Sequence, residues 1–401
     1  MATDAEHPRL ILHNFLSLDL CRELEFIHKS CCTVGYRPNV FSTTLSHLIA
    51  TNSAHLILPF ISIRERLKEK AEEFFGCEYQ LFVEFTGLIS WSKGASIGWH
   101  SDDNRSYLKQ RDFAAVCYLN NHGEDFNGGL FQFQDGKPTT VVPVAGDVIM
   151  YTADSRNIHS VHEIMDGERL TLTLWFSRDS SHDEDAKLIS LLSQSLSNNF
   201  VDEPILHLPL PAPNNMYWFS PDQGSQCQSG FDIRLARAHV LGYTFYSFHD
   251  QLLDTSQNLS EWLMSPLRLA MEDELFYKEF VNSLHALQVL QFCCWKVSEL
   301  RETEVGRAIT NVVPLSQSLQ EKSSGWKLTL GDHQLAETVF RSLSNYEDSK
   351  PAFGWADLHA AVFAWENYTC KLRKELLIRY PYWRTYQSIF FVPLVDLEKE
   401  A

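Results

Sequence analysis

The sequence feature that most constrains the fold is a series of short, β-prone runs between residues 79 and 178. Turn signals such as Asn127-Gly128-Gly129 separate these runs. The runs cover 81–91, 113–119, 129–134, 139–144, 147–152 and 169–177. Many short strands at this spacing are typical of a sandwich, jelly roll or barrel. We therefore expect residues 79–178 to form a β-rich core.

The flanks of this core on its N-terminal and C-terminal sides have helical patterns. Residues 9–15 predict a strand, and apolar positions at helical spacing predict helices over 18–29, 61–75 and 184–196. The second of these helices is expected to end at Gly76. The pattern predicts a first domain over 1–198, in which N-terminal helices support the β core.

A Pro-rich stretch near 198–214 marks the best domain boundary. Beyond it, residues 230–300 and 355–380 have helical patterns, and short strands are expected at 326–330 and 386–394. We therefore predict a second, mainly helical region over 199–401, whose role and partners the sequence leaves open.

Charge and composition exclude some classes of function. Of 401 residues, 44% are hydrophobic, which is a globular composition. The formal net charge of −17 disfavours nucleic acid or an anionic membrane as a partner. Nine cysteines without a CxxC motif predict buried free thiols in a reducing compartment. With no recognisable signal peptide or membrane-spanning stretch, we expect a cytoplasmic or nuclear location.

The chemical signal begins at His100-Ser101-Asp102. On a strand, residues i and i+2 face the same side, so this pair could bind one metal ion. Sixteen histidines and 51 acidic residues predict roughly two His-x-Asp/Glu tripeptides by chance, and the chain has three. The tripeptide alone is therefore weak support for a metal site, because an ordinary histidine near an acid would look the same.

The motifs that follow distinguish His100 from the histidines of the other two His-x-Asp/Glu tripeptides. They are Tyr118-Leu119-Asn120, Gly128-Gly129 with an aromatic strand, Gly146-Asp147, His159, and Arg169 ten residues after His159. This ordered series resembles the catalytic domain shared by prolyl and lysyl hydroxylases, and it is most similar to the prolyl 3-hydroxylase branch. The resemblance covers about residues 80–178 and extends more loosely to 9–29.

The resemblance implies an Fe(II)- and 2-oxoglutarate-dependent dioxygenase. His100, Asp102 and His159 match the iron ligands, a 2-His-1-carboxylate set that leaves positions open. Arg169 matches the basic residue that pairs with the far carboxylate of 2-oxoglutarate, a task that suits a planar guanidinium. Tyr118 matches a frequent co-substrate contact, although packing in the core is an equal alternative. The expected fold is α+β, with a double-stranded β-helix (jelly-roll) core.

The implied reaction consumes O₂, decarboxylates 2-oxoglutarate to succinate and hydroxylates a C–H bond. L-ascorbate is a candidate accessory. The favoured substrate is a prolyl residue of a protein or peptide; a lysyl residue or a small molecule is the alternative. An inactive jelly-roll scaffold is the non-enzyme alternative, and a cupin-type site is disfavoured because cupins usually offer more histidines in one motif. Neither the position hydroxylated nor the oligomeric state follows from the sequence.

Two positions test this interpretation. His162 is a rival for the third ligand, but it lies seven residues before Arg169, where the family spacing is ten. Trp91 occupies a place where many relatives have a tyrosine that donates to the co-substrate, which leaves the detailed co-substrate contacts open.

Overall fold

The computed structural model describes residues 6–31, 33–34, 39–50, 53–198, 288, 292, 295–296 and 355–393. The chain divides into two compact units, one of Met1–Phe231 with Thr369–Ala401 and the other of Asp232–Tyr368. The predicted Pro-rich boundary and the strand expected at 326–330 lie outside the described residues. So does the helix expected over 230–300, apart from four positions, all helical.

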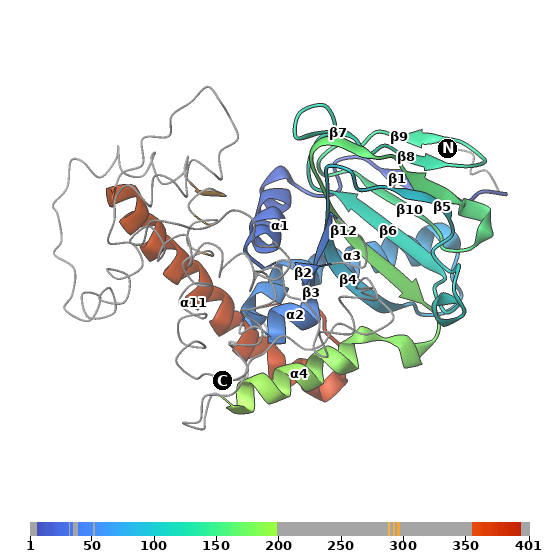
Figure 1. The fold of residues 1–401 in the computed structure, drawn as a ribbon. Helices are drawn as coiled ribbons and strands as arrows, with labels where there is room; N and C mark the ends of the chain where they lie inside the picture. Colours follow the sequence, from blue (N-terminus) through green and yellow to red (C-terminus); the bar gives the residue numbers. More distant parts are fainter. Residues whose placement is uncertain are drawn as a thin grey trace, which may run out of the picture. The chain divides into compact units, whose positions relative to one another are not determined.

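An eight-stranded antiparallel sheet dominates the first unit (Figure 1). Seven strands follow one another across it, and β7 (Phe126–Gly128) pairs with β12 off this path. In spatial order they are β1 (Arg9–Leu12), β10 (Val148–Thr152), β6 (Phe113–Tyr118), β12 (Ile164–Ser177), β4 (Phe82–Ser92), β3 (Val40–Thr44) and β2 (Thr33–Val34). The predicted runs in this part of the chain become strands, because each is rich in apolar and β-branched residues, and β6 and β10 are buried at every position.

A second antiparallel sheet of four strands packs over the first. Its order is β5 (Ile97–His100), β11 (His159–Val161), β8 (Phe131–Phe133) and β9 (Thr140–Val141). One buried apolar cluster joins the two sheets, with Tyr118 and Tyr151 from the large sheet and Phe131 and Val161 from the small one. Because side chains alternate along a strand, every second residue of β6, β10 and β12 faces this interior.

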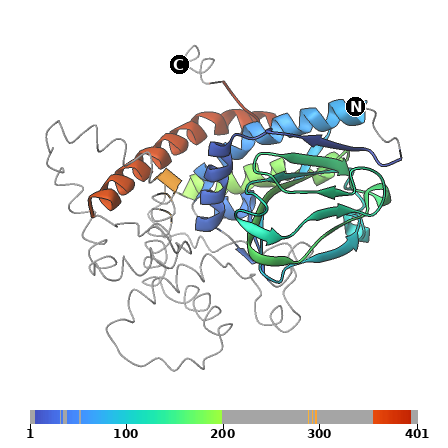
Figure 2. The same cartoon turned by 90° about the horizontal axis from the view of Figure 1, so that it is seen from above.

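Helices cover the large sheet on one side, as Figure 2 shows from above. They are α1 (Leu18–Cys31), α2 (Leu45–Ala50), α3 (Leu58–Phe75) and α4 (Glu184–Asn198), with 3₁₀ turns at η1 (Ala54–Ile57), η2 (Ser106–Leu108), η3 (Ser155–Asn157) and η4 (Ser180–His182). α1, α3 and α4 contact β4. The predicted stop of α3 is confirmed, since Gly76 ends it in the left-handed conformation with φ 62°. Antiparallel sheets with flanking helices make this an α+β fold, as expected.

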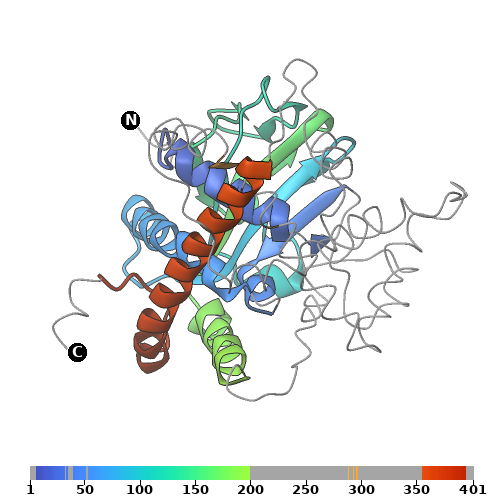
Figure 3. The same cartoon turned by 90° about the vertical axis from the view of Figure 1, so that its left-hand side faces the viewer.

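The last described segment corrects one prediction. Helix α11 (Trp355–Tyr386) is longer than expected, and residues 387–393 form no strand. Instead, side chains accept hydrogen bonds from the backbone of this segment. The Ile389 amide donates to Asp185 at 2.7 Å, and the Phe391 amide donates to Glu65 at 2.7 Å. The later part of α11 lies beside α4 (Figure 3), where the Tyr380 and Ser193 hydroxyls are 2.6 Å apart.

Among the described residues, no helix is long and apolar enough to cross a membrane.

Candidate metal and co-substrate site

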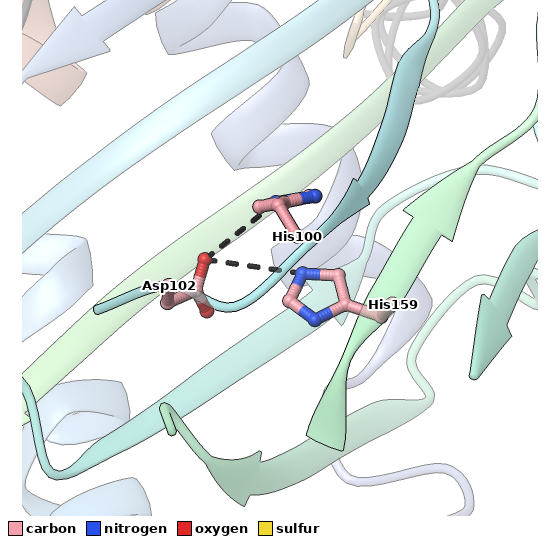
Figure 4. A group of neighbouring side chains, drawn as sticks. All are labelled: His100, Asp102 and His159. Atoms are coloured by element: carbon pink, nitrogen blue, oxygen red, sulfur yellow. Dashed lines mark ion pairs between the residues drawn. The ribbon is translucent and has the colours of Figure 1, made fainter. Parts of the chain in front are cut away.

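Strand pairing brings the two predicted histidines together. His100 is the last residue of β5 and His159 the first of β11, and these two positions are partners in the antiparallel register. Their rings lie 4.3 Å apart (Figure 4). The two histidines are 59 positions apart in the sequence, and the pairing of two neighbouring strands brings them together.

Asp102 reaches the histidines from a turn, which corrects the prediction that it lies on the strand of His100. Its Oδ1 is 3.9 Å from Nε2 of His100 and 3.8 Å from Nε2 of His159. Asp103 holds the turn, because its carboxylate accepts from Ser101 at 2.7 Å and from Lys109 at 2.7 Å. The neighbouring carboxylate therefore shapes the loop, and Asp102 is the one that faces the histidines.

Ligand atoms of His100, Asp102 and His159 all lie within 4.8 Å of one another, close enough to hold one metal ion. Each histidine uses its other nitrogen to donate to a backbone carbonyl, His100 Nδ1 to Gly98 at 2.8 Å and His159 Nδ1 to Asn157 at 2.9 Å. A carbonyl only accepts, so Nδ1 carries a proton, and in the neutral ring this tautomer leaves the Nε2 lone pair to bind a metal. Burial also lowers the pKa of His159 to about 4, so its ring is neutral at neutral pH.

The Asp102 carboxylate is ionised in this setting. Burial opposes its charge, but His159, His100 and Arg111 outweigh that effect, so the pKa of Asp102 lies below its ordinary value. Its second oxygen, Oδ2, accepts a hydrogen bond from the Tyr151 hydroxyl at 3.0 Å. Two imidazoles and one carboxylate form the donor set that Fe(II) oxygenases use.

The predicted co-substrate residue Arg169 lies on β12, with its side chain on the same interior face. It is 2% exposed, and among the described residues it forms no ion pair; its Nε has no hydrogen-bond partner. Its guanidinium carbon lies 5.3 Å from the centre of the Tyr118 ring. The Tyr118 hydroxyl is also buried without a hydrogen-bond partner, and burial raises the pKa of Tyr118 to about 12. A buried cation with no carboxylate partner among the described residues, lying beside a buried hydroxyl, fits the carboxylate of a small ligand.

Three neighbours fix the position of Arg169. The side chain of Asn120 donates to the Glu168 carbonyl at 2.7 Å and accepts from the Leu170 amide at 2.9 Å, so it is more than the turn residue it resembles in sequence. Trp91 is the β4 partner of Arg169 and is buried in the core. Gly129 leaves space, since a Cβ there would lie 3.1 Å from Arg169 Cδ. The motifs around the site therefore position its side chains as well as shaping turns.

Of the remaining candidates, His162 is exposed just after β11 and lies outside the group of three. The Arg111 guanidinium stacks over the Trp175 ring, 3.6 Å from its centre. Arg111 in turn pairs with Glu84, its Nε 3.2 Å from each carboxylate oxygen. No pattern in the sequence indicated Arg111 or Tyr151 as neighbours of Asp102, because alternation along a strand predicts a face and not a partner.

Comparisons with known proteins agree with this geometry. Residues 86–177 match the family model of the 2OG-Fe(II) oxygenase superfamily. The chain therefore contains a domain of that superfamily, and the matched residues include His100, Asp102, His159 and Arg169.

Two curated relatives and one solved structure illustrate the similarity. The "2-oxoglutarate and iron-dependent oxygenase domain-containing protein 3" of Mus musculus is 34% identical over 196 residues, covering 45% of this chain and 61% of that protein. "Prolyl 3-hydroxylase 1" of Gallus gallus is 26% identical over 220 residues, covering 44% of this chain and 30% of that protein. A Pseudomonas putida prolyl-4-hydroxylase structure is 18% identical with a TM-score of 0.34, covering 43% of this chain and 94% of that one. The chain spans less than two thirds of both curated relatives.

Proposed function

We propose that this chain is an Fe(II)- and 2-oxoglutarate-dependent dioxygenase that hydroxylates a prolyl residue of a protein or peptide. The main observation behind the proposal is that two features lie together in the interior between the two sheets. One is the His100, Asp102 and His159 group, and the other is the buried Arg169, for which the described part of the chain offers no carboxylate partner. Tyr151 lies between the two features, because its hydroxyl donates to Asp102 at 3.0 Å and its ring belongs to the same buried cluster as Tyr118.

In this proposal each residue has a distinct task. His100, Asp102 and His159 hold Fe(II), while Arg169 and Tyr118 bind the far carboxylate of 2-oxoglutarate through charge-assisted hydrogen bonds. When bound, Fe(II) and 2-oxoglutarate supply the oxidising chemistry that converts O₂ and 2-oxoglutarate to CO₂ and succinate as a C–H bond is hydroxylated. The apolar cluster around Phe131 and Phe133 excludes water from that reaction.

The finer assignments belong to the same proposal. We propose that the two sheets form a double-stranded β-helix, that residues 1–198 are the oxygenase domain, and that 199–401 contribute a partner or substrate surface. The prolyl substrate is supported by the name of the Gallus gallus relative, which aligns over 30% of its own length. L-ascorbate as an accessory and a cytoplasmic or nuclear location stay predictions.

The test is succinate release by the full chain, loaded anaerobically with Fe(II) and then exposed to O₂. Prolyl peptides, lysyl peptides and small molecules are offered in parallel, with the His100→Ala and Asp102→Ala variants as controls. We expect prolyl peptides to stimulate succinate release in the unmodified chain and not in either variant. Stimulation by lysyl peptides or small molecules alone would replace the substrate assignment. Bound iron without any turnover of 2-oxoglutarate would support the inactive scaffold instead.

A further inference from the structure

We propose that Tyr151 is a positioning residue that fixes the Asp102 carboxylate in the orientation needed to bind the metal. The inference rests on the metal site of the proposed function. Its basis is that the two oxygens of Asp102 have different partners. Oδ2 accepts from the Tyr151 hydroxyl at 3.0 Å, whereas Oδ1 lies 3.9 Å and 3.8 Å from Nε2 of His100 and His159.

Asp102 needs such a partner because of where it lies. It belongs to the turn after β5, so no strand pairing fixes its backbone on both sides. The torsion that rotates a carboxylate is broad, so the two oxygens can exchange unless a donor holds one of them. Carboxylates that bind metals are usually held by a hydrogen bond of this kind, and the bond selects which oxygen faces the metal.

Tyr151, by contrast, is rigidly placed. It lies in β10, which pairs with β1 on one side and β6 on the other, and it is 2% exposed. Its ring packs at centroid distances of 5.7 Å from Phe131, 5.6 Å from Phe133 and 4.9 Å from His159. A hydroxyl presented from a packed, doubly paired strand has little freedom, which suits it to hold a more mobile carboxylate in place.

The ring and the hydroxyl of Tyr151 have separable tasks. A phenylalanine would keep the packing against Phe131 and Phe133 but could not donate to Asp102. The Tyr151 hydroxyl is also 3.4 Å from Nε2 of His159, so it lies at the side of the site where the ligand atoms converge. The Tyr151→Phe substitution therefore removes the positioning bond and leaves the core nearly unchanged.

The experiment measures metal affinity rather than turnover. Mn(II), a stand-in that does not start the oxidation, is titrated anaerobically into the full chain and into Tyr151→Phe, Asp102→Ala and Tyr380→Phe. Tyr380→Phe is the matched control, since it removes a hydroxyl that contacts Ser193 between α11 and α4, outside the site. Far-UV circular dichroism and the urea midpoint check that each variant is folded.

We expect Tyr151→Phe to bind Mn(II) about 10- to 100-fold more weakly than the unmodified chain, the usual effect of removing such a partner. The Tyr380→Phe control should bind as the unmodified chain does. Equal affinity in Tyr151→Phe, with Asp102→Ala unable to bind, overturns the inference and leaves the metal site intact. No binding by the unmodified chain would instead refute the metal site itself.

Discussion

Replacing Arg169 with methionine should separate stability from co-substrate binding. Arg169 is buried, and among the residues that the structure describes it has no carboxylate to neutralise it. The effective cost of taking such an ion out of water is several kcal/mol. Its position over the Tyr118 ring, at 5.3 Å, returns only about 0.5–2 kcal/mol. We therefore expect Arg169→Met to leave the unfolding free energy unchanged or to raise it by about 1–3 kcal/mol.

Arg111 offers a matched control, because it is an equally buried arginine that does have a partner. Its Nε lies 3.2 Å from both oxygens of Glu84. Arg111→Met leaves the largely buried Glu84 carboxylate without its cation, with Gln110 as its remaining donor at 3.0 Å, which should lower the unfolding free energy by about 3–5 kcal/mol. The same substitution is thus expected to have opposite effects at two buried positions.

Arg169→Met should also weaken the binding of the co-substrate. Hydrogen bonds to a charged group contribute about 1.5–3 kcal/mol, so Arg169→Met should weaken 2-oxoglutarate binding roughly 10- to 150-fold. Stability is measured by urea denaturation without metal, and binding by calorimetry on Mn(II)-loaded protein. The reasoning is refuted if Arg169→Met destabilises the chain as much as Arg111→Met does, or if it binds 2-oxoglutarate normally.

Further predictions test which histidine binds the metal, why position 129 is a glycine, and how the buried Glu184 affects stability. His159→Ala should abolish Mn(II) binding and His162→Ala, at an exposed position, should leave it unchanged; the reverse result would exchange their roles. Gly129→Ala should lower the unfolding free energy by about 1–3 kcal/mol in urea titrations, because φ is 62° and the new Cβ would lie 2.3 Å from Ile164 Cδ1; an unchanged midpoint would contradict this. Burial raises the pKa of Glu184 from 4.5 to about 7, so the folded state holds that proton more tightly than the unfolded chain. The unfolding free energy should therefore fall as pH rises through this window, and Glu184→Gln should flatten the slope in urea titrations at pH 5 and pH 7.5.

Local pattern predicted most of the elements and missed the shortest ones. The long runs at 81–91 and 169–177 became β4 and β12, and the helical face at 184–196 became α4. Strands such as β5 and β11, four and three residues long, carry too little alternation to be recognised. The strand expected at 386–394 is wrong, because the backbone amides of Ile389 and Phe391 donate to the side chains of Asp185 and Glu65 and not to a neighbouring strand.

The sequence by itself determined the residue types and the order of the site, from His100-x-Asp102 to His159 and Arg169 ten residues later. Those features depend on spacing along the chain, which a sequence contains in full. Only the tertiary structure decided that β5 and β11 pair in a register that sets the two histidines face to face. Register is a property of two segments far apart in the chain, so no local pattern encodes it. For the same reason only the structure places Tyr151 against Asp102 and leaves Arg169 buried without a partner among the described residues.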